Sequence, residues 1–201
     1  MQSATEDSRS EDPLKRRSFT VRDQIRRLIW NVFCALFFRP SPTRMHGYRC
    51  GLLRLFGANI GRSNYIYPSA KIWAPWLLET ADVVTLGPAC EVYNPGGIQL
   101  GHHTIISQGA YLCGATHDYN SFTFDYIKKP ITTEAYVWIC ARAIVLPGVH
   151  CDVGSVLGAG SVATRSLEPW GVYAGNPAKK VKDRNQFDVL APDGTSGDAI
   201  Q

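Results

Sequence analysis

The residues of this chain that could carry acid–base or nucleophilic chemistry are five histidines and six cysteines. A histidine can take a proton from a hydroxyl group at neutral pH, because the pKa of an ordinary imidazole lies close to neutrality. The cysteines have neither CxxC nor zinc-finger spacing, so we interpret them as small buried hydrophobic side chains and expect no metal site. The histidines are His46, His102, His103, His117 and His150, and the cysteines are Cys34, Cys50, Cys90, Cys113, Cys140 and Cys151.

The segments that must position these residues begin with a strongly basic region. Residues 15–54 carry ten lysines and arginines against one acid, Asp23, which gives a local charge of +9 in a chain of net charge +4. Its apolar run at residues 32–38 is far shorter than the ~20 residues that cross a bilayer. No nucleic-acid-binding motif accompanies the basic side chains, so we expect no nucleic acid partner.

Residues 19–56 are expected to form short helices. Ile25, Leu28, Ile29, Val32 and Phe33 recur at helical spacing, and the prolines that follow residue 38 prevent the first helix from continuing. Two interpretations stay open: the apolar face of this helix packs on the main domain, or the region 15–54 lies on the inner face of an anionic membrane. We expect residues 1–18 to be disordered and residues 185–201 to form a flexible tail.

A six-residue repeat dominates residues 57–184. From Thr133 to Ala163 every sixth residue is small or aliphatic, and shorter runs with the same step begin at Ile60, Leu86 and Leu100. This step fits neither the two-residue period of a strand nor the 3.6-residue period of a helix. It predicts a mainly β domain in which three short strands and three corners make a coil of about 18 residues.

The residues from 137 to 182, VWICARAIVLPGVHCDVGSVLGAGSVATRSLEPWGVYAGNPAKKVK, resemble the C-terminal signature of the hexapeptide-repeat acyltransferases, which include maltose and galactoside O-acetyltransferases. The sequences LFFRPSP at 36–42, HGYR at 46–49, LLRLFGANIG at 52–61 and THDY at 116–119 are similar to the colanic-acid-type acetyltransferase branch. The resemblance implies a left-handed parallel β-helix with a protruding loop at 117–132. It also implies a homotrimer with active sites between subunits.

The resemblance also assigns roles to individual residues. It makes His117 the general base, whereas His102, His103 and His150 are interpreted as solvated turn residues. Asn94 and Asp118 are expected to bind the acceptor. Trp138 and the Ala141 amide would flank the thioester of acetyl-CoA, with that amide as oxyanion donor. The remaining donor contacts are Ala159 and Thr164 along pantetheine, and Arg165, Lys179 and Lys182 at the CoA phosphates.

The function implied is transfer of an acetyl group from acetyl-CoA to a saccharide hydroxyl, in exopolysaccharide biosynthesis. We expect a cytoplasmic enzyme that needs no metal, and a lipid-linked acceptor would account for the basic N-terminal helix. Three alternatives remain: another small acceptor such as an antibiotic or amino sugar, a non-catalytic β-helix scaffold, and a β-helix carbonic anhydrase. The last requires three histidines on zinc, and its usual H-x4-H pair is absent from this sequence.

Overall fold

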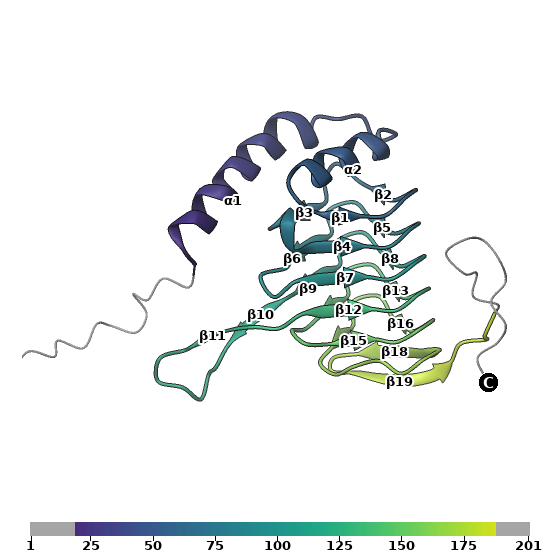
Figure 1. The fold of residues 1–201 in the computed structure, drawn as a ribbon. Helices are drawn as coiled ribbons and strands as arrows, with labels where there is room; N and C mark the ends of the chain where they lie inside the picture. Colours follow the sequence, from purple (N-terminus) through teal and green to yellow (C-terminus); the bar gives the residue numbers. More distant parts are fainter. Residues whose placement is uncertain (1–18, 188–201) are drawn as a thin grey trace, which may run out of the picture.

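The computed structural model describes residues 19–187, which form a β-helix of three parallel sheets closed at one end by helices (Figure 1). The segment predicted to be disordered, 1–18, lies outside the described residues, as do residues 188–201 of the tail predicted at 185–201. Each coil contributes one strand to each sheet in turn. Consecutive strands of a coil meet at an edge, and each edge is named here by the two sheets that it joins.

The three sheets collect different parts of each coil. The first sheet contains β1 (Asn59–Ile60), β4 (Leu78–Thr80), β7 (Ile98–Leu100), β12 (Ile131–Thr133) and β15 (His150–Cys151). The second contains β2 (Tyr65–Ile66), β5 (Thr85–Leu86), β8 (Ile105–Ile106), β13 (Trp138–Ile139), β16 (Val156–Leu157), β18 (Gly171–Gly175) and β19 (Ala178–Asp183), and it ends in an antiparallel pair of strands, β18 and β19. The third contains β3 (Lys71–Ile72), β6 (Glu91–Tyr93), β9 (Tyr111–Cys113), β14 (Ile144–Val145) and β17 (Val162–Ala163). A 3-10 turn, η3 (Pro75–Leu77), precedes β4.

The core is the stack of repeat positions along the axis. In the second sheet, parallel pairing places Ile66, Leu86, Ile106, Ile139 and Leu157 in register, and all five side chains are fully buried. Each coil can bury these side chains only against its neighbours, which makes the coils mutually dependent for stability. The six-residue step therefore predicted the inward-facing positions correctly, and the expected parallel β-helix is confirmed.

One coil departs from the regular path. Between β9 and β12 the chain leaves the third–first edge as an antiparallel hairpin, β10 (Ala115–His117) and β11 (Tyr126–Lys128), which projects from the body in Figure 1. This hairpin corresponds to the loop that was expected to protrude at 117–132, but it begins two residues earlier, at Ala115. It carries His117 at the end of its first strand.

Helices close the first coil. α1 (Val21–Phe33) begins with a capping box between Thr20 and Asp23 and continues as the π-helix η2 (Cys34–Phe38). α2 (His46–Leu55) follows and carries Arg49, which is wholly buried. The Arg49 guanidinium donates hydrogen bonds to the Ile66 carbonyl (2.6 Å) and the Pro42 carbonyl (2.8 Å), among others. Arg49 thereby joins the turn between the helices to the second sheet.

The interpretation that α1 packs its apolar face on the main domain holds for Phe33, which is half-buried against the core, and is wrong for the other four residues of that face. Ile25, Leu28, Ile29 and Val32 are 53–63% exposed. The buried side of the helix is instead formed around Trp30, whose indole N–H donates to the Ile72 carbonyl at 2.8 Å. Within residues 19–187, none of the helices is both long and apolar enough to cross a bilayer.

Candidate active site

His117 lies on the hairpin at the third–first edge, with its side chain exposed. It pairs with Tyr126 across the hairpin, and the two rings are 5.3 Å apart between centroids. The imidazole Nδ1 lies 2.7 Å from the carbonyl oxygen of Phe124. A carbonyl can only accept a hydrogen bond, so in the neutral imidazole Nδ1 carries the proton and donates it. This tautomer leaves Nε2 with a free lone pair, the arrangement that a general base requires.

The hairpin is held to the body of the β-helix through Tyr126. The Tyr126 hydroxyl lies 2.7 Å from the hydroxyl of Tyr93 at the end of β6, a residue 33 positions earlier in the chain. Burial, followed by the hydrogen bond to Tyr93, raises the pKa of the Tyr126 phenol well above its usual value. The Tyr126 phenol therefore stays protonated at neutral pH, and either hydroxyl of the pair can be the donor.

The start of α1 contacts the same hairpin. The Phe19 ring lies 5.3 Å from the Tyr126 ring and 5.1 Å from the Trp73 ring. The ammonium of Lys128 in β11 is 4.9 Å from the Phe19 ring centroid. The hairpin is thus supported by an aromatic cluster of Phe19, which precedes α1, Trp73, which follows β3, and Tyr126 of β11.

The two residues expected to bind the acceptor are engaged elsewhere. Asp118 Oδ1 accepts a hydrogen bond from the Asn120 amide at 2.9 Å and so shapes the hairpin turn. Asn94 is fully buried, and its side-chain amide bridges the backbone N–H (3.0 Å) and carbonyl (2.8 Å) of Ala74 in the preceding coil. This geometry favours a structural role for Asn94. Acceptor binding by either residue remains a prediction.

Most of the residues expected to hold the donor lie on or beside the second sheet. Trp138 is 44% exposed on β13, and its indole N–H donates to Ser107 Oγ at 2.9 Å. Ala141 and Ala159 follow β13 and β16 and occupy the second–third edge in successive coils, where the Gly160 amide donates to the Ala141 carbonyl at 2.9 Å. Ala141 and Ala159 thus place small side chains in successive coils, and Ala141 follows the strand that carries the exposed indole of Trp138.

The basic residues expected at the CoA phosphates are divided between two places. Lys179 and Lys182 are exposed on β19, the antiparallel strand at the margin of the second sheet. Lys180 between them is paired with Glu168 (3.2 Å) and Asp183 (2.9 Å). Arg165, together with Thr164, follows β17 at the third–first edge.

The base and most of the donor surface consequently occupy different edges of one chain. His117, Thr164 and Arg165 belong to the third–first edge, whereas Ala141 and Ala159 belong to the second–third edge. The third sheet separates the two edges. A site that uses both groups cannot be assembled on a single edge of one β-helix.

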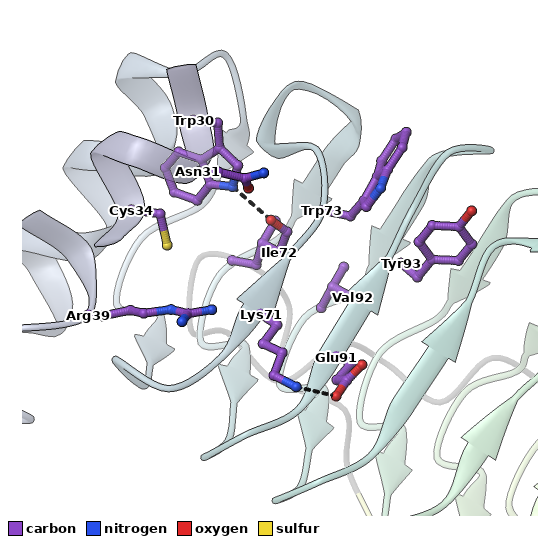
Figure 2. A pocket seen from close by; sticks show the side chains of 10 residues that line it. All are labelled: Trp30, Asn31, Cys34, Arg39, Lys71, Ile72, Trp73, Glu91, Val92 and Tyr93. Atoms are coloured by element: carbon purple, nitrogen blue, oxygen red, sulfur yellow. Dashed lines mark hydrogen bonds and ion pairs between the residues drawn. The ribbon is translucent and has the colours of Figure 1, made fainter. Parts of the chain in front are cut away.

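A groove of about 240 Å³ lies between the helices and the third sheet, lined by Trp30, Asn31, Cys34, Arg39, Lys71, Ile72, Trp73, Glu91, Val92 and Tyr93 (Figure 2). Lys71 and Glu91 form an ion pair of 2.6 Å at one side of it. The groove contains none of the residues predicted for the site. Tyr93 lines the groove and also forms the hydrogen bond with Tyr126 of the hairpin, so the groove and the hairpin share this residue.

The remaining histidines and the cysteines have structural contacts. His102 and His103 lie in the turn of a coil corner as expected, half-buried, and the ring of His103 stacks on Tyr136 at 4.6 Å; His150 lies instead in the strand β15, with its Nδ1 2.7 Å from Thr132 Oγ1. All six cysteines are free, and Cys34, Cys50, Cys90 and Cys151 are buried as expected. Among residues 19–187, no group of three or more His, Cys, Asp or Glu side chains is placed to hold a metal ion.

Comparison with known proteins identifies the family. No protein-family model matches the chain. WcaF of Escherichia coli strain K12, named as a colanic acid biosynthesis acetyltransferase, is 37% identical over 168 residues, which cover 84% of this chain and 92% of WcaF. The chain belongs to the hexapeptide-repeat acetyltransferases. Within that family its resemblance is to the colanic-acid-type branch, as the sequence indicated.

Solved structures of the family share the fold. A hexapeptide-repeat acetyltransferase from Vibrio cholerae in complex with acetyl-CoA has a TM-score of 0.75 at 20% identity, covering 85% of this chain and 93% of that one. A maltose O-acetyltransferase from Clostridium difficile has a TM-score of 0.71 at 19% identity, covering 83% and 90% of the two chains. These two likenesses concern the fold alone.

Sequence reasoning missed the residues that position His117 in this family member. The orienting group is the backbone carbonyl of Phe124, which no side-chain pattern reveals. Tyr93 and Tyr126 were not predicted to contact each other, because nothing in their spacing indicates that the hairpin folds back to β6. Ser107, the partner of Trp138, could have been found from the coil register, since β8 and β13 are adjacent strands.

Proposed function

We propose that this chain transfers an acetyl group from acetyl-CoA to a hydroxyl of a saccharide in exopolysaccharide biosynthesis, with His117 as general base. The observation that carries the proposal is the 2.7 Å contact between His117 Nδ1 and the Phe124 carbonyl, which leaves Nε2 free on an exposed side chain. The 37% identity with WcaF over most of both chains supports the class of acceptor.

The reaction proceeds by direct attack. His117 Nε2 takes the proton of the acceptor hydroxyl as its oxygen bonds to the thioester carbonyl carbon, and the carbonyl oxygen becomes an oxyanion. The backbone amide of Ala141 donates to that oxyanion. When the carbon–sulfur bond breaks, the proton passes from Nε2 to the departing thiolate, which yields the acetyl ester and free CoA. No covalent acyl-enzyme is formed.

The donor site is assigned to the surface beside Trp138. The exposed indole and the small residues Ala141 and Ala159 provide a shallow track for the narrow pantetheine arm, and Lys179 and Lys182 supply charge for the phosphates. Because this track and His117 occupy different edges, a homotrimer in which neighbouring subunits complete each site fits the geometry.

Three kinds of acceptor are compatible with the proposed chemistry. A saccharide carried on a lipid is consistent with a basic helix that contacts the catalytic hairpin through Phe19. An antibiotic or an amino sugar would use the same chemistry at a hydroxyl or amine. These acceptors can be separated by measuring CoA release with neutral sugars, an amino sugar and chloramphenicol in parallel.

The test of the mechanism is the His117→Ala variant. We expect it to fold and to bind CoA in calorimetry as the wild type does, while acetyl transfer to the best saccharide falls by 10²–10⁴-fold. The matched control is His102→Ala, which removes a half-buried histidine at a coil corner away from the hairpin. Full activity of His117→Ala would refute the base assignment, and absence of CoA binding by the wild type would favour a scaffold.

A further inference from the structure

The most unusual surface of the described chain is the outward face of α1 and η2. Apolar side chains recur there every three or four residues and remain about half exposed or more: Val21 (56%), Ile25 (54%), Leu28 (63%), Ile29 (56%), Val32 (53%), Leu36 (62%) and Phe37 (48%). We call this set the α1 stripe. Spacing of this kind is normally found on the buried face of a helix. Here it faces away from the β-helix, and a contiguous apolar surface indicates a binding partner.

The α1 stripe cannot turn inward without breaking the contacts that fix the helix. Trp30 is 1% exposed and donates its indole N–H to Ile72 in β3. On the same side, the Arg26 guanidinium lies 4.0 Å from the Trp76 ring centroid, and that of Arg27 lies 4.6 Å from the ring of Trp73. Cation–π contacts of this kind add to the anchoring. The helix is therefore fastened by its aromatic and basic side and leaves its aliphatic side unpartnered.

The charge around the α1 stripe is almost entirely positive. Arg22 and Arg44 are exposed in and after the helix, whereas Arg39 lines the groove between the helices and the third sheet. The single acid of the region, Asp23, accepts hydrogen bonds from Thr20 in the capping box and is committed to the start of the helix. The charged residues along the α1 stripe are therefore basic, apart from the capping residue Asp23. Such a stripe is complementary to a partner that has an apolar interior and negative charges at its surface.

We infer that the α1 stripe is a docking surface for an anionic phospholipid bilayer, in which α1 lies parallel to the membrane with its aliphatic side chains among the acyl chains. Arg22 and Arg44 then contact lipid phosphates. A second copy of α1 packed against the α1 stripe would bring two such basic regions together, which is electrostatically unfavourable. The inference does not use the chemistry of His117, so its failure would leave the proposed function intact.

The experiment is co-sedimentation of the full chain with vesicles. Wild type is expected to pellet with vesicles of equal parts phosphatidylglycerol and phosphatidylcholine, and to stay in solution with phosphatidylcholine alone. Leu28→Glu should bind the anionic vesicles about tenfold more weakly, because it removes one buried apolar side chain and adds a repelled charge. Raising the salt concentration should weaken wild-type binding, since the lipid charges are screened.

The matched control is Val181→Glu. Val181 is 59% exposed on β19, at the opposite end of the β-helix from α1 (Figure 1), so it has nearly the exposure of Leu28 and receives the same charge change. This variant should bind vesicles as the wild type does, and circular dichroism should show both variants folded. The inference is overturned if wild type does not pellet with anionic vesicles, or if the two variants bind equally well. It is also overturned if light scattering shows that Leu28→Glu dissociates an oligomer while vesicle binding is unchanged, because the α1 stripe would then be covered by a second copy.

Discussion

The hydroxyl of Tyr126, on the hairpin that carries His117, lies 2.7 Å from the hydroxyl of Tyr93 on the body of the β-helix. This contact joins two segments that are 33 residues apart, and the Tyr126 ring also contacts the ring of His117. Tyr126 is therefore a positioning residue. It holds the base through the hairpin and does not need to touch the acceptor.

Replacing Tyr126 with phenylalanine tests this role, because the ring and its contacts with Phe19 and His117 are kept while the hydrogen bond is lost. A neutral hydrogen bond contributes about 1 kcal/mol, so we expect kcat to fall roughly fivefold. The KM for acetyl-CoA should not change, since the donor track lies elsewhere. Tyr93→Phe should give the same result, and the double variant should be no worse than either single one. The control is Tyr67→Phe, at a residue that follows β2 and whose ring lies 5.3 Å from that of His46 in α2. It should have wild-type kinetics; a matching loss there would show a general effect on the fold.

The regular coils were predictable because the inward position recurs at a constant step. The side chain at every sixth residue packs against the equivalent side chains of the coils before and after it. Ile139, Val145 and Leu157 could therefore be placed in the core without knowledge of distant contacts. The hairpin has no such repeat. Its contacts with Phe19 and Tyr93 join segments far apart in sequence, and they depend on the direction in which a loop folds back.

The position of Asn94 leads to a second prediction, on stability. Asn94→Ala would leave the buried N–H of Ala74 without its partner, at a cost of about 1–3 kcal/mol, while the Ala74 carbonyl would keep the hydrogen bond from the Leu77 N–H. Urea denaturation should show this loss, whereas the folded enzyme should keep its KM for the acceptor. Asn120→Ala, on the exposed hairpin turn, is the control and should be nearly neutral. The opposite result, a raised acceptor KM with unchanged stability, would restore the acceptor-binding role that the resemblance implied.

The orientation of α1 shows a second limit of sequence reasoning. Helical spacing of Ile25, Leu28, Ile29 and Val32 predicted an amphipathic helix correctly, but periodicity alone does not state which face is buried. The structure buries the face of Trp30, because a large aromatic side chain with a hydrogen bond to Ile72 fills the space above the first coil. The amphipathic character of α1 could be predicted from its sequence, but the face that it buries could not.

The buried thiols predict a loss of stability at high pH. Burial raises the pKa of Cys90 and of Cys151 to about 12, against a usual value near 9. Between these values the unfolded chain has lost the thiol protons that the folded chain retains, so the folded state is favoured less as pH rises. Below pH 9 both states hold the protons and no loss is expected. The slope should approach about 1.4 kcal/mol per pH unit for each thiol.

Chemical denaturation at pH 8, 9, 10 and 11 would measure this slope. Cys90→Ala and Cys151→Ala should each flatten it, whatever they do to stability at pH 8. Cys140→Ala, at a half-buried corner, provides the comparison and should leave most of the slope in place. A profile that is identical in all the variants would assign the loss of stability to other groups.

The separation of His117 from the donor track leads to the last prediction, which concerns mixed oligomers. If one subunit supplies the base and its neighbour supplies the track, two inactive variants can restore each other in one assembly. His117→Ala has an intact track, and Trp138→Ala, which removes the indole bonded to Ser107, has an intact base. Co-expressed in equal amounts in a homotrimer, they should regenerate about one quarter of the wild-type sites, because each site draws its two halves independently from neighbouring chains. Mixing the two variants after separate purification, without subunit exchange, should give no activity. If the co-expressed pair is as inactive as its parents while His117→Ala with wild type is active, both halves of the site belong to one chain, and the hairpin must fold across the third sheet to reach the donor.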